Sequence, residues 1–71
     1  MKDVNTIVGE NIQHYRRRQG LTQHQLARRI GVTYQAISKW ETGKSTPDIA
    51  LLPELARVFE CRIDDFFIRS A

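Results

Sequence analysis

Apolar residues in this chain recur mainly at intervals of three and four positions, the spacing that places side chains on one face of an α-helix. Four such groups are Val8, Ile12 and Tyr15; Leu26, Ala27 and Ile30; Ala36, Ile37 and Trp40; and Leu51, Leu52, Leu55, Ala56, Val58 and Phe59. A fifth, shorter segment runs from Cys61 to Ile68 and contains two adjacent phenylalanines. The pattern therefore predicts an all-α fold.

Capping residues divide the middle of the chain into two short helices. Thr22 is a favourable N-cap, and Gln25 three residues later completes a capping box. Gly31 stands where a helix ends in a left-handed residue, and Thr33 is at once a second N-cap. Because a connection this short makes the two helices cross steeply, we expect a helix-turn-helix motif at about residues 22–42.

The ends of the other helices are less sharply defined. Asn5 or Thr6 is suited to cap the first helix, and Gly20 to end it. Asp48 is suited to cap the fourth, but Pro53 lacks a backbone N–H and disfavours helix at the residue before it. Two alternatives are open: a regular helix begins at Pro53 after an irregular start, or the helix bends there.

The exposed face of the second helix of the motif suits DNA reading. At 100° per residue the apolar stripe takes one side of this helix, and the other side presents Tyr34, Gln35, Ser38, Lys39 and Thr42. That side contains no carboxylate, whereas a merely solvated helix face usually mixes both signs. Glutamine can bind an adenine edge at two points, and lysine binds guanine acceptors or phosphate. Gly43 ends the helix.

These motifs resemble the DNA-binding domain of the phage repressor and Cro-like (xenobiotic response element type) helix-turn-helix family. The matching residues are Val8-Gly9-Glu10, Ile12, Arg16, Leu21-Thr22-Gln23, Leu26-Ala27, Ile30-Gly31-Val32, Ile37-Ser38-Lys39-Trp40-Glu41, Gly43-Lys44 and, more loosely, Pro47, Leu55-Ala56 and Ile63-Asp64-Asp65-Phe66-Phe67. They span roughly residues 6–68. The resemblance implies a single compact domain over residues 1–71, of the five-helix lambda-repressor-like type, with the motif formed by its second and third helices.

The expected DNA site follows from this face and from the resemblance. With the recognition helix, Thr33–Thr42, in the major groove, we expect bases to be read by Thr33, Tyr34, Gln35, Ser38 and Lys39. Phosphate contacts are expected from Arg17, Gln23, Thr42, Lys44, Ser45 and Thr46. Gln23 begins a helix whose free N–H groups suit a phosphate, although an ordinary exposed residue is the alternative. Tyr34 stands where the family often has glutamine or asparagine, so the base it reads is not inherited from any relative.

Arg16 has a separate role by resemblance. The matching arginine of the family pairs with the glutamate that matches Glu41, which ties the first helix to the end of the recognition helix. A second phosphate contact is the alternative. The chain departs from the family at Glu60, where glycine or asparagine usually follows the fourth helix, and at Arg62, where a small polar residue usually caps the fifth.

Composition places the chain among small globular proteins with an uneven charge. Its 71 residues are 41% hydrophobic and 27% charged, with a net charge of +3. Residues 1–44 contain eight Lys or Arg against three Asp or Glu, and residues 45–71 contain three against five. Five arginines and no acid lie between Asn11 and Ile30. Beside a helix-turn-helix motif, this basic run favours a surface that faces phosphate over a merely solvated one.

The sequence offers little for catalysis, metal binding or membrane insertion. His14 and His24 lack a clustered third ligand, so we expect no metal, no cofactor and surface histidines. Cys61 is the only cysteine, which excludes an internal disulfide and favours a reducing, cytoplasmic location. A buried structural thiol explains Cys61 better than a nucleophile does, and no apolar run is long enough to span a membrane. We expect no enzyme.

The most consistent function is a sequence-specific regulator of transcription, a repressor, that binds double-stranded DNA. One recognition helix reads few base pairs, so we expect a palindromic operator and a weak homodimer that forms on it. Phe66 and Phe67 cannot both be buried by so short a helix, which suggests a dimer contact at Phe67 or Ile68. The alternatives to this contact are that Phe67 completes the core or that the chain is a fragment of a longer regulator. The alternative function is an antitoxin-type module that binds a partner toxin and its own operator.

Overall fold

A computed structural model describes residues 2–69 of the chain. Its four α-helices are α1 (Val4–Arg18), α2 (Gln23–Ile30), α3 (Tyr34–Glu41) and α4 (Leu52–Phe59), and two short 3-10 helices are η1 (Ile49–Leu51) and η2 (Ile63–Phe67). Over residues 2–69 there is no strand. The all-α expectation is confirmed, but the count of five helices is not, because the segment expected as the fifth helix forms only the short η2.

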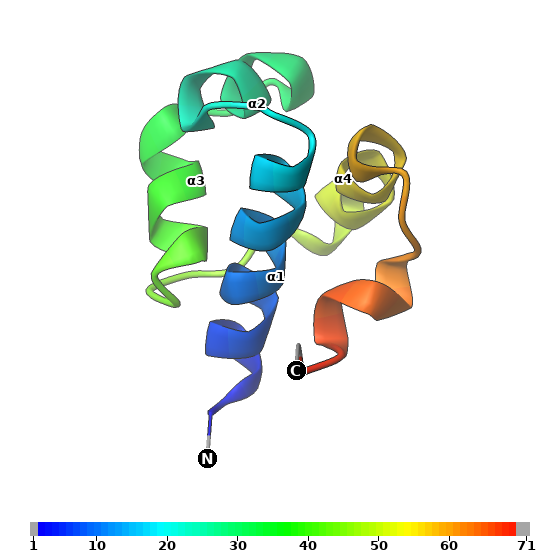
Figure 1. Ribbon diagram of the computed structural model, residues 1–71. Coiled ribbons are helices and arrows are strands. Elements are labelled where there is room, and N and C mark those ends of the chain that lie inside the picture. Colours follow the sequence, from blue (N-terminus) through cyan, green and yellow to red (C-terminus); the bar gives the residue numbers. More distant parts are fainter. Residues whose placement is uncertain (1, 70–71) are drawn as a thin grey trace.

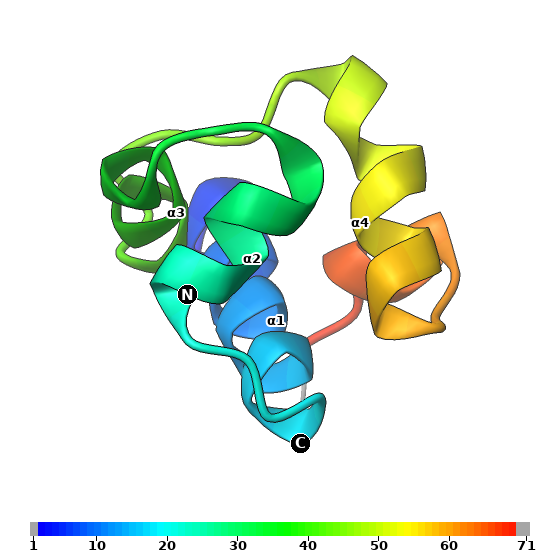
Figure 2. The ribbon, with the colours of Figure 1, turned by 90° about the horizontal axis from the view of Figure 1, so that it is seen from above.

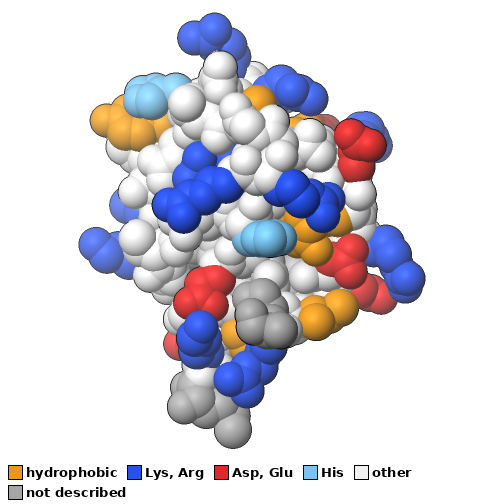
Figure 3. All heavy atoms as spheres, in the orientation of Figure 1, with side chains coloured by type: hydrophobic (Ala, Val, Ile, Leu, Met, Phe, Trp, Pro, Cys, Tyr) orange, Lys and Arg blue, Asp and Glu red, His pale blue; other side chains and the backbone are white. Residues whose placement is uncertain are grey.

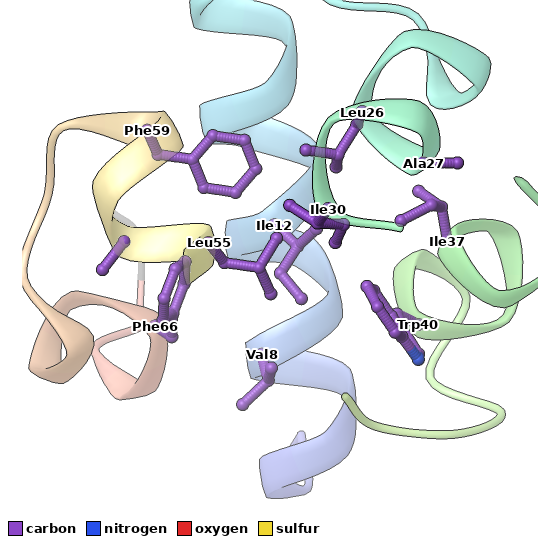
Figure 4. Packing of buried hydrophobic residues seen from close by; sticks show 11 residues of the cluster. Val8, Ile12, Leu26, Ala27, Ile30, Ile37, Trp40, Leu55, Phe59 and Phe66 are labelled. Carbon is purple, nitrogen blue, oxygen red and sulfur yellow. The ribbon is translucent and has the colours of Figure 1, made fainter. Parts of the chain in front are cut away.

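Helix α1 lies in the middle of the molecule (Figure 1). Helix α3 packs along one side of it, α2 lies across its C-terminal end, and α4 with the C-terminal segment covers the other side, as the view from above also shows (Figure 2). The buried apolar side chains of all four helices and η2 form one cluster (Figure 4): Val8, Ile12, Leu26, Ala27, Ile30, Ile37, Trp40, Leu55, Ala56, Phe59 and Phe66. This core holds the helix-turn-helix motif against α1.

The predicted caps of the motif are present. The Thr22 side chain accepts a hydrogen bond from the backbone N–H of Gln25, whose own side chain accepts from the N–H of Thr22. Gly31 has a φ of 76°, and the Thr33 side chain accepts from the N–H of Ala36. These local bonds set both the length of each helix and the sharp turn between them.

The predicted cap of the first helix was wrong by a few residues. Asp3 caps α1, because its carboxylate accepts a hydrogen bond of 2.8 Å from the N–H of Thr6. As an N-cap, the Asp3 carboxylate has an advantage over the uncharged side chains of Asn5 and Thr6, because its negative charge also complements the positive end of the helix dipole. That hydrogen bond lowers the pKa of Asp3. Gly20 ends the helix as expected, with a φ of 72°.

The chain takes the first of the two courses considered for Pro53. Asp48 caps η1 by accepting from the N–H of Ala50 at 3.0 Å, and Leu52 then begins α4 with the proline in its first turn. A proline fits the first turn because its missing N–H would have no partner inside the helix. Glu60 ends α4 with a φ of 55°, a backbone conformation in which glycine or asparagine is more usual.

A buried polar residue that the sequence patterns did not reveal holds the C-terminal segment. Asn11, only 4% exposed, donates from its amide nitrogen to the carbonyl oxygens of Phe66 and Ile68, each at 2.8 Å. These two hydrogen bonds tie the segment from Phe66 to Ile68 to α1, while at the start of η2 the Asp65 carboxylate accepts from the backbone N–H of Arg62 at 2.9 Å. As a result Phe66 is fully buried, whereas Phe67 is 49% exposed.

Candidate nucleic-acid interface

The side chains expected to read bases lie on the outer face of α3. Thr33, Tyr34, Gln35 and Lys39 are exposed and Ser38 is half-buried. Ile37 and Trp40, on the inner face of the same helix, are 0% and 5% exposed and belong to the core. The helical period thus separates a packed face from a polar face on one eight-residue helix. That polar face can offer hydrogen-bond donors and acceptors to a groove of DNA.

Tyr34 is not isolated on this face. Its ring stacks on the imidazole of His24, with ring centroids 4.0 Å apart and planes inclined by 29°. His24 is the second residue of α2 and Tyr34 is the first residue of α3, so the pair joins the N-terminal ends of the two helices of the motif. The sequence patterns identified His24 only as a surface histidine, which it is, but gave no sign of its partner.

A buried ion pair joins α1 to the end of α3. The guanidinium of Arg16 donates to Glu41 through Nε at 2.6 Å and through Nη2 at 3.1 Å. The two side chains are 11% and 1% exposed, and Arg16 also donates to the carbonyl of Leu21 at 2.7 Å. Arg16 is therefore a structural residue that orients α3 and the start of α2, and is not a free group for phosphate.

Two glutamine side chains complete the environment of Glu41. Gln13 and Gln23 donate their amide nitrogens to Glu41 Oε1 at 3.3 Å and 3.1 Å. Gln23 was expected to contact phosphate, but its amide is engaged inside the protein, so in that role it would have to share or release this bond. Gln13 was not singled out from the sequence. Its position three residues before Arg16, on the same helix face, is the signal that could have identified it.

The remaining phosphate candidates lie at the surface. Arg17, Lys44 and Thr46 are exposed, and Ser45 is half-buried in the loop that follows α3. Thr42 is exposed as well, but its hydroxyl donates to the carbonyl of Ser38 at 3.0 Å. Within residues 2–69 neither Arg17 nor Lys44 forms an ion pair with an acidic side chain.

The electrostatic character of the surface differs between its two ends. Seen from one side, the upper left part over α2 and α3 shows basic side chains and no acidic one, and the acidic side chains lie lower and to the right (Figure 3). Glu41 is the only carboxylate between residues 11 and 44, and it is buried against Arg16. The surface of the motif is therefore basic, as a phosphate-facing surface needs to be.

The described residues contain no alternative chemical centre. Across residues 2–69 no group of three His, Cys, Asp or Glu side chains could hold a metal ion. Cys61 packs half-buried against the core, and its burial raises the pKa of its thiol, which disfavours the reactive thiolate. Within the same range no helix is both long enough and apolar enough to cross a membrane.

The fold and the exposed polar helix together define a helix-turn-helix domain. A family model described as helix-turn-helix matches residues 12–66, and the chain belongs to this Cro/C1-type family of DNA-binding transcriptional regulators, which are not enzymes. An uncharacterised HTH-type transcriptional regulator of Archaeoglobus fulgidus is 42% identical over 57 residues, which are 80% of this chain and 81% of that protein.

Two further comparisons show how much of other proteins this chain resembles. The HTH-type transcriptional activator BcrR of Enterococcus faecalis is 41% identical over 56 residues, which are 79% of this chain but 28% of BcrR. The crystal structure of the clp gene regulator ClgR from C. glutamicum superposes with a TM-score of 0.82 over 93% of this chain and 86% of that chain, at 20% identity. The second likeness shows a shared fold.

Proposed function

We propose that this chain is a sequence-specific DNA-binding repressor that places α3 in the major groove. The observation that supports this most directly is the outer face of α3, which is polar, exposed and free of acid above a buried apolar face. In the proposed complex Thr33, Tyr34, Gln35, Ser38 and Lys39 read base edges. Repression follows by steric exclusion of polymerase from a promoter that overlaps the operator, which needs no contact beyond the DNA-binding surface.

Phosphate contacts on both sides of α3 would fix its register in the groove. Lys44, Ser45 and Thr46 follow α3 directly, in the loop after Gly43. Arg17 lies one helical turn beyond Gln13, whose side chain reaches Glu41 at the end of α3, so the Arg17 charge is on the side of α1 that faces the motif. Such contacts carry no sequence information, but they supply salt-dependent affinity.

The test separates base contacts from phosphate contacts. Duplexes are selected from a random pool, and affinity for the selected and for a scrambled duplex is measured by fluorescence anisotropy at several salt concentrations. Gln35→Ala and Lys39→Ala are each expected to weaken binding to the selected duplex by about 1–3 kcal/mol while changing binding to the scrambled duplex little. A ratio of the two affinities that stays at the wild-type value in both variants would refute the assignment of the reading face.

Lys44→Ala is the matched control, because it removes one exposed charge next to the same helix. It should weaken both duplexes alike and reduce the slope of log affinity against log salt by about one. If Lys44→Ala instead altered only the selected duplex, the loop after α3 would be reading bases, and the division into base and phosphate contacts would have to be redrawn.

A second copy of the chain is the proposed partner on DNA. The exposed apolar side chains of Val4, Ile49 and Phe67 line one groove, together with Asn5, Val8, Thr46, Pro47 and Leu52. This groove includes Thr46, in the loop proposed to contact phosphate, so it lies beside the proposed DNA contact. The residues from 45 onward carry more acid than base, and two copies would therefore repel less there than through their basic helices.

Phe67→Ser tests this contact. Half of the Phe67 surface is already exposed, so the change should lower the free energy of unfolding by only about 1 kcal/mol. It should abolish cooperative filling of two half-sites spaced by about 34 Å and leave affinity for a single half-site unchanged. The control is Ile63→Ser, on the same 3-10 helix but not among the groove residues. Retained cooperativity in Phe67→Ser, or its loss in both variants, would place the interface elsewhere.

A further inference from the structure

The rings of His24 and Tyr34 stack on each other at the protein surface, outside the core cluster. Both residues are exposed, with Tyr34 at 41%, and neither belongs to the core cluster. Within residues 2–69 no side-chain hydrogen bond holds either ring. Yet the rings lie face to face with centroids 4.0 Å apart, across the two helices of the motif. The stack therefore brings one face of the Tyr34 ring against a side chain of the other helix of the motif.

A role in stability does not explain this contact well. Both rings stay at the surface and outside the core cluster, and the motif is already held by the core and by its caps. What the stack does change is the freedom of the Tyr34 side chain. A tyrosine on a helix surface moves among rotamers, and a partner against one ring face limits that movement.

We propose that His24 is a positioning residue for Tyr34: its imidazole covers one ring face and holds the tyrosine in the orientation that contacts DNA. This inference rests on the proposed function, in which Tyr34 reads the major groove. The hydroxyl, the ring edge and the second ring face stay available for a thymine methyl or a hydrogen bond. His24 acts before DNA arrives, by removing the cost of ordering Tyr34 on binding.

Three variants separate this role from direct contact with DNA. His24→Ala removes the stack, whereas His24→Phe keeps a flat ring but cannot donate to phosphate. Tyr34→Ala provides the background in which a positioning residue has nothing left to position. His14→Ala is the matched control, since His14 is also an exposed histidine and packs edge-on against Tyr15 on α1, with centroids 5.2 Å apart.

Affinities are measured for a duplex selected from a random pool and for its scrambled form. His24→Ala should bind the selected duplex roughly three- to tenfold more weakly, the loss expected from ordering one side chain, with its affinity for the scrambled duplex unchanged. His24→Phe and His14→Ala should stay within about twofold of wild type. In the Tyr34→Ala background, His24→Ala should cause no further loss.

Several results would overturn the proposal. His24→Ala binding the selected duplex like wild type would do so, and so would equal losses in His24→Ala and His24→Phe, which would indicate a phosphate contact. A loss that persists without Tyr34 would also contradict it. If Tyr34→Ala leaves the affinity ratio unchanged while Gln35→Ala lowers it, the DNA-binding function stands and the positioning role fails. If no α3 variant changes the ratio, both fail.

The stack itself can be tested without DNA. In the free protein, proton NMR should show ring-current shifts and nuclear Overhauser contacts between the His24 and Tyr34 rings. The Tyr34 ring signals should move towards random-coil positions in His24→Ala and stay displaced in His24→Phe. Tyr34 signals that do not differ between wild type and His24→Ala would show that the rings are not stacked in solution, and the proposal would be wrong whatever the DNA measurements give.

Discussion

Gly9→Ala is expected to destabilise the protein by at least about 3 kcal/mol, although alanine is the better helix former. A Cβ atom at Gly9 would lie 2.0 Å from the carbonyl oxygen of Trp40, so α1 and α3 could not keep their present distance. The higher helix propensity of alanine would stabilise the fold by only about 1 kcal/mol. The clash is the larger effect, because the obstacle is backbone and not a flexible side chain. Urea unfolding followed by Trp40 fluorescence measures the difference.

Gly20→Ala is the matched control. Its Cβ would meet nothing within 4 Å, and only its φ of 72° opposes a side chain. The expected cost is about 1–2 kcal/mol. Equal midpoints for Gly9→Ala and Gly20→Ala would mean that the close approach of α1 and α3 does not exist in solution. Since that approach sets the position of the recognition helix, Gly9→Ala should also lose binding to a selected duplex under conditions in which Gly20→Ala retains it.

Arg16→Ala is expected to cost about 3 kcal/mol or more of unfolding free energy. The change leaves the Glu41 carboxylate, whose side chain is 1% exposed, without its cationic partner. Breaking a buried pair in this way is more harmful than removing both partners. Hydrogen bonds from Gln13 and Gln23 to Glu41 remain, and they keep the cost near the lower end of the usual range. Denaturant unfolding at neutral pH measures it.

Arg17→Ala is the control for this experiment, because Arg17 is exposed and the substitution should change the free energy of unfolding by no more than about 0.5 kcal/mol. Arg18 is less suitable, since its guanidinium lies 4.8 Å from the centroid of the Tyr15 ring and donates to the carbonyl of Phe59 at 3.4 Å. Glu41→Gln in the Arg16→Ala background removes the unpaired charge and should recover part of the loss. Equal stability of Arg16→Ala and Arg17→Ala would contradict the structural role of the pair.

Local sequence was sufficient where the cause of a structure is local. The caps at Thr22 and Thr33 follow from side chains that reach only three residues along the chain, and the left-handed turn at Gly31 follows from its lack of a Cβ atom. The division of α3 into a buried face and an exposed face follows from the helical period alone. For this reason the helix-turn-helix motif could be predicted. The absence of acid from the outer face of α3, and so the expectation of DNA, came from the same pattern.

Contacts between distant residues could not be predicted from such patterns. Asn11 meets the carbonyl of Phe66 across 55 positions, and Gln23 meets Glu41 across 18. No local signal distinguishes an amide that bonds inside the protein from one that stays free for DNA. The fifth helix was expected from family resemblance, but the structure has only the five-residue 3-10 helix η2 there, held to α1 by the hydrogen bonds from Asn11.

By itself the sequence therefore determined the four α-helices, the motif and the chemistry of its exposed face, because caps and periodicity act over one or two turns. Only the tertiary structure decided which polar groups are already occupied. It placed the Gln23 amide on Glu41, left Phe67 half exposed at a groove, and brought the ring of His24 onto that of Tyr34. These outcomes depend on how the helices pack, since packing sets the distances between side chains that are far apart in the chain.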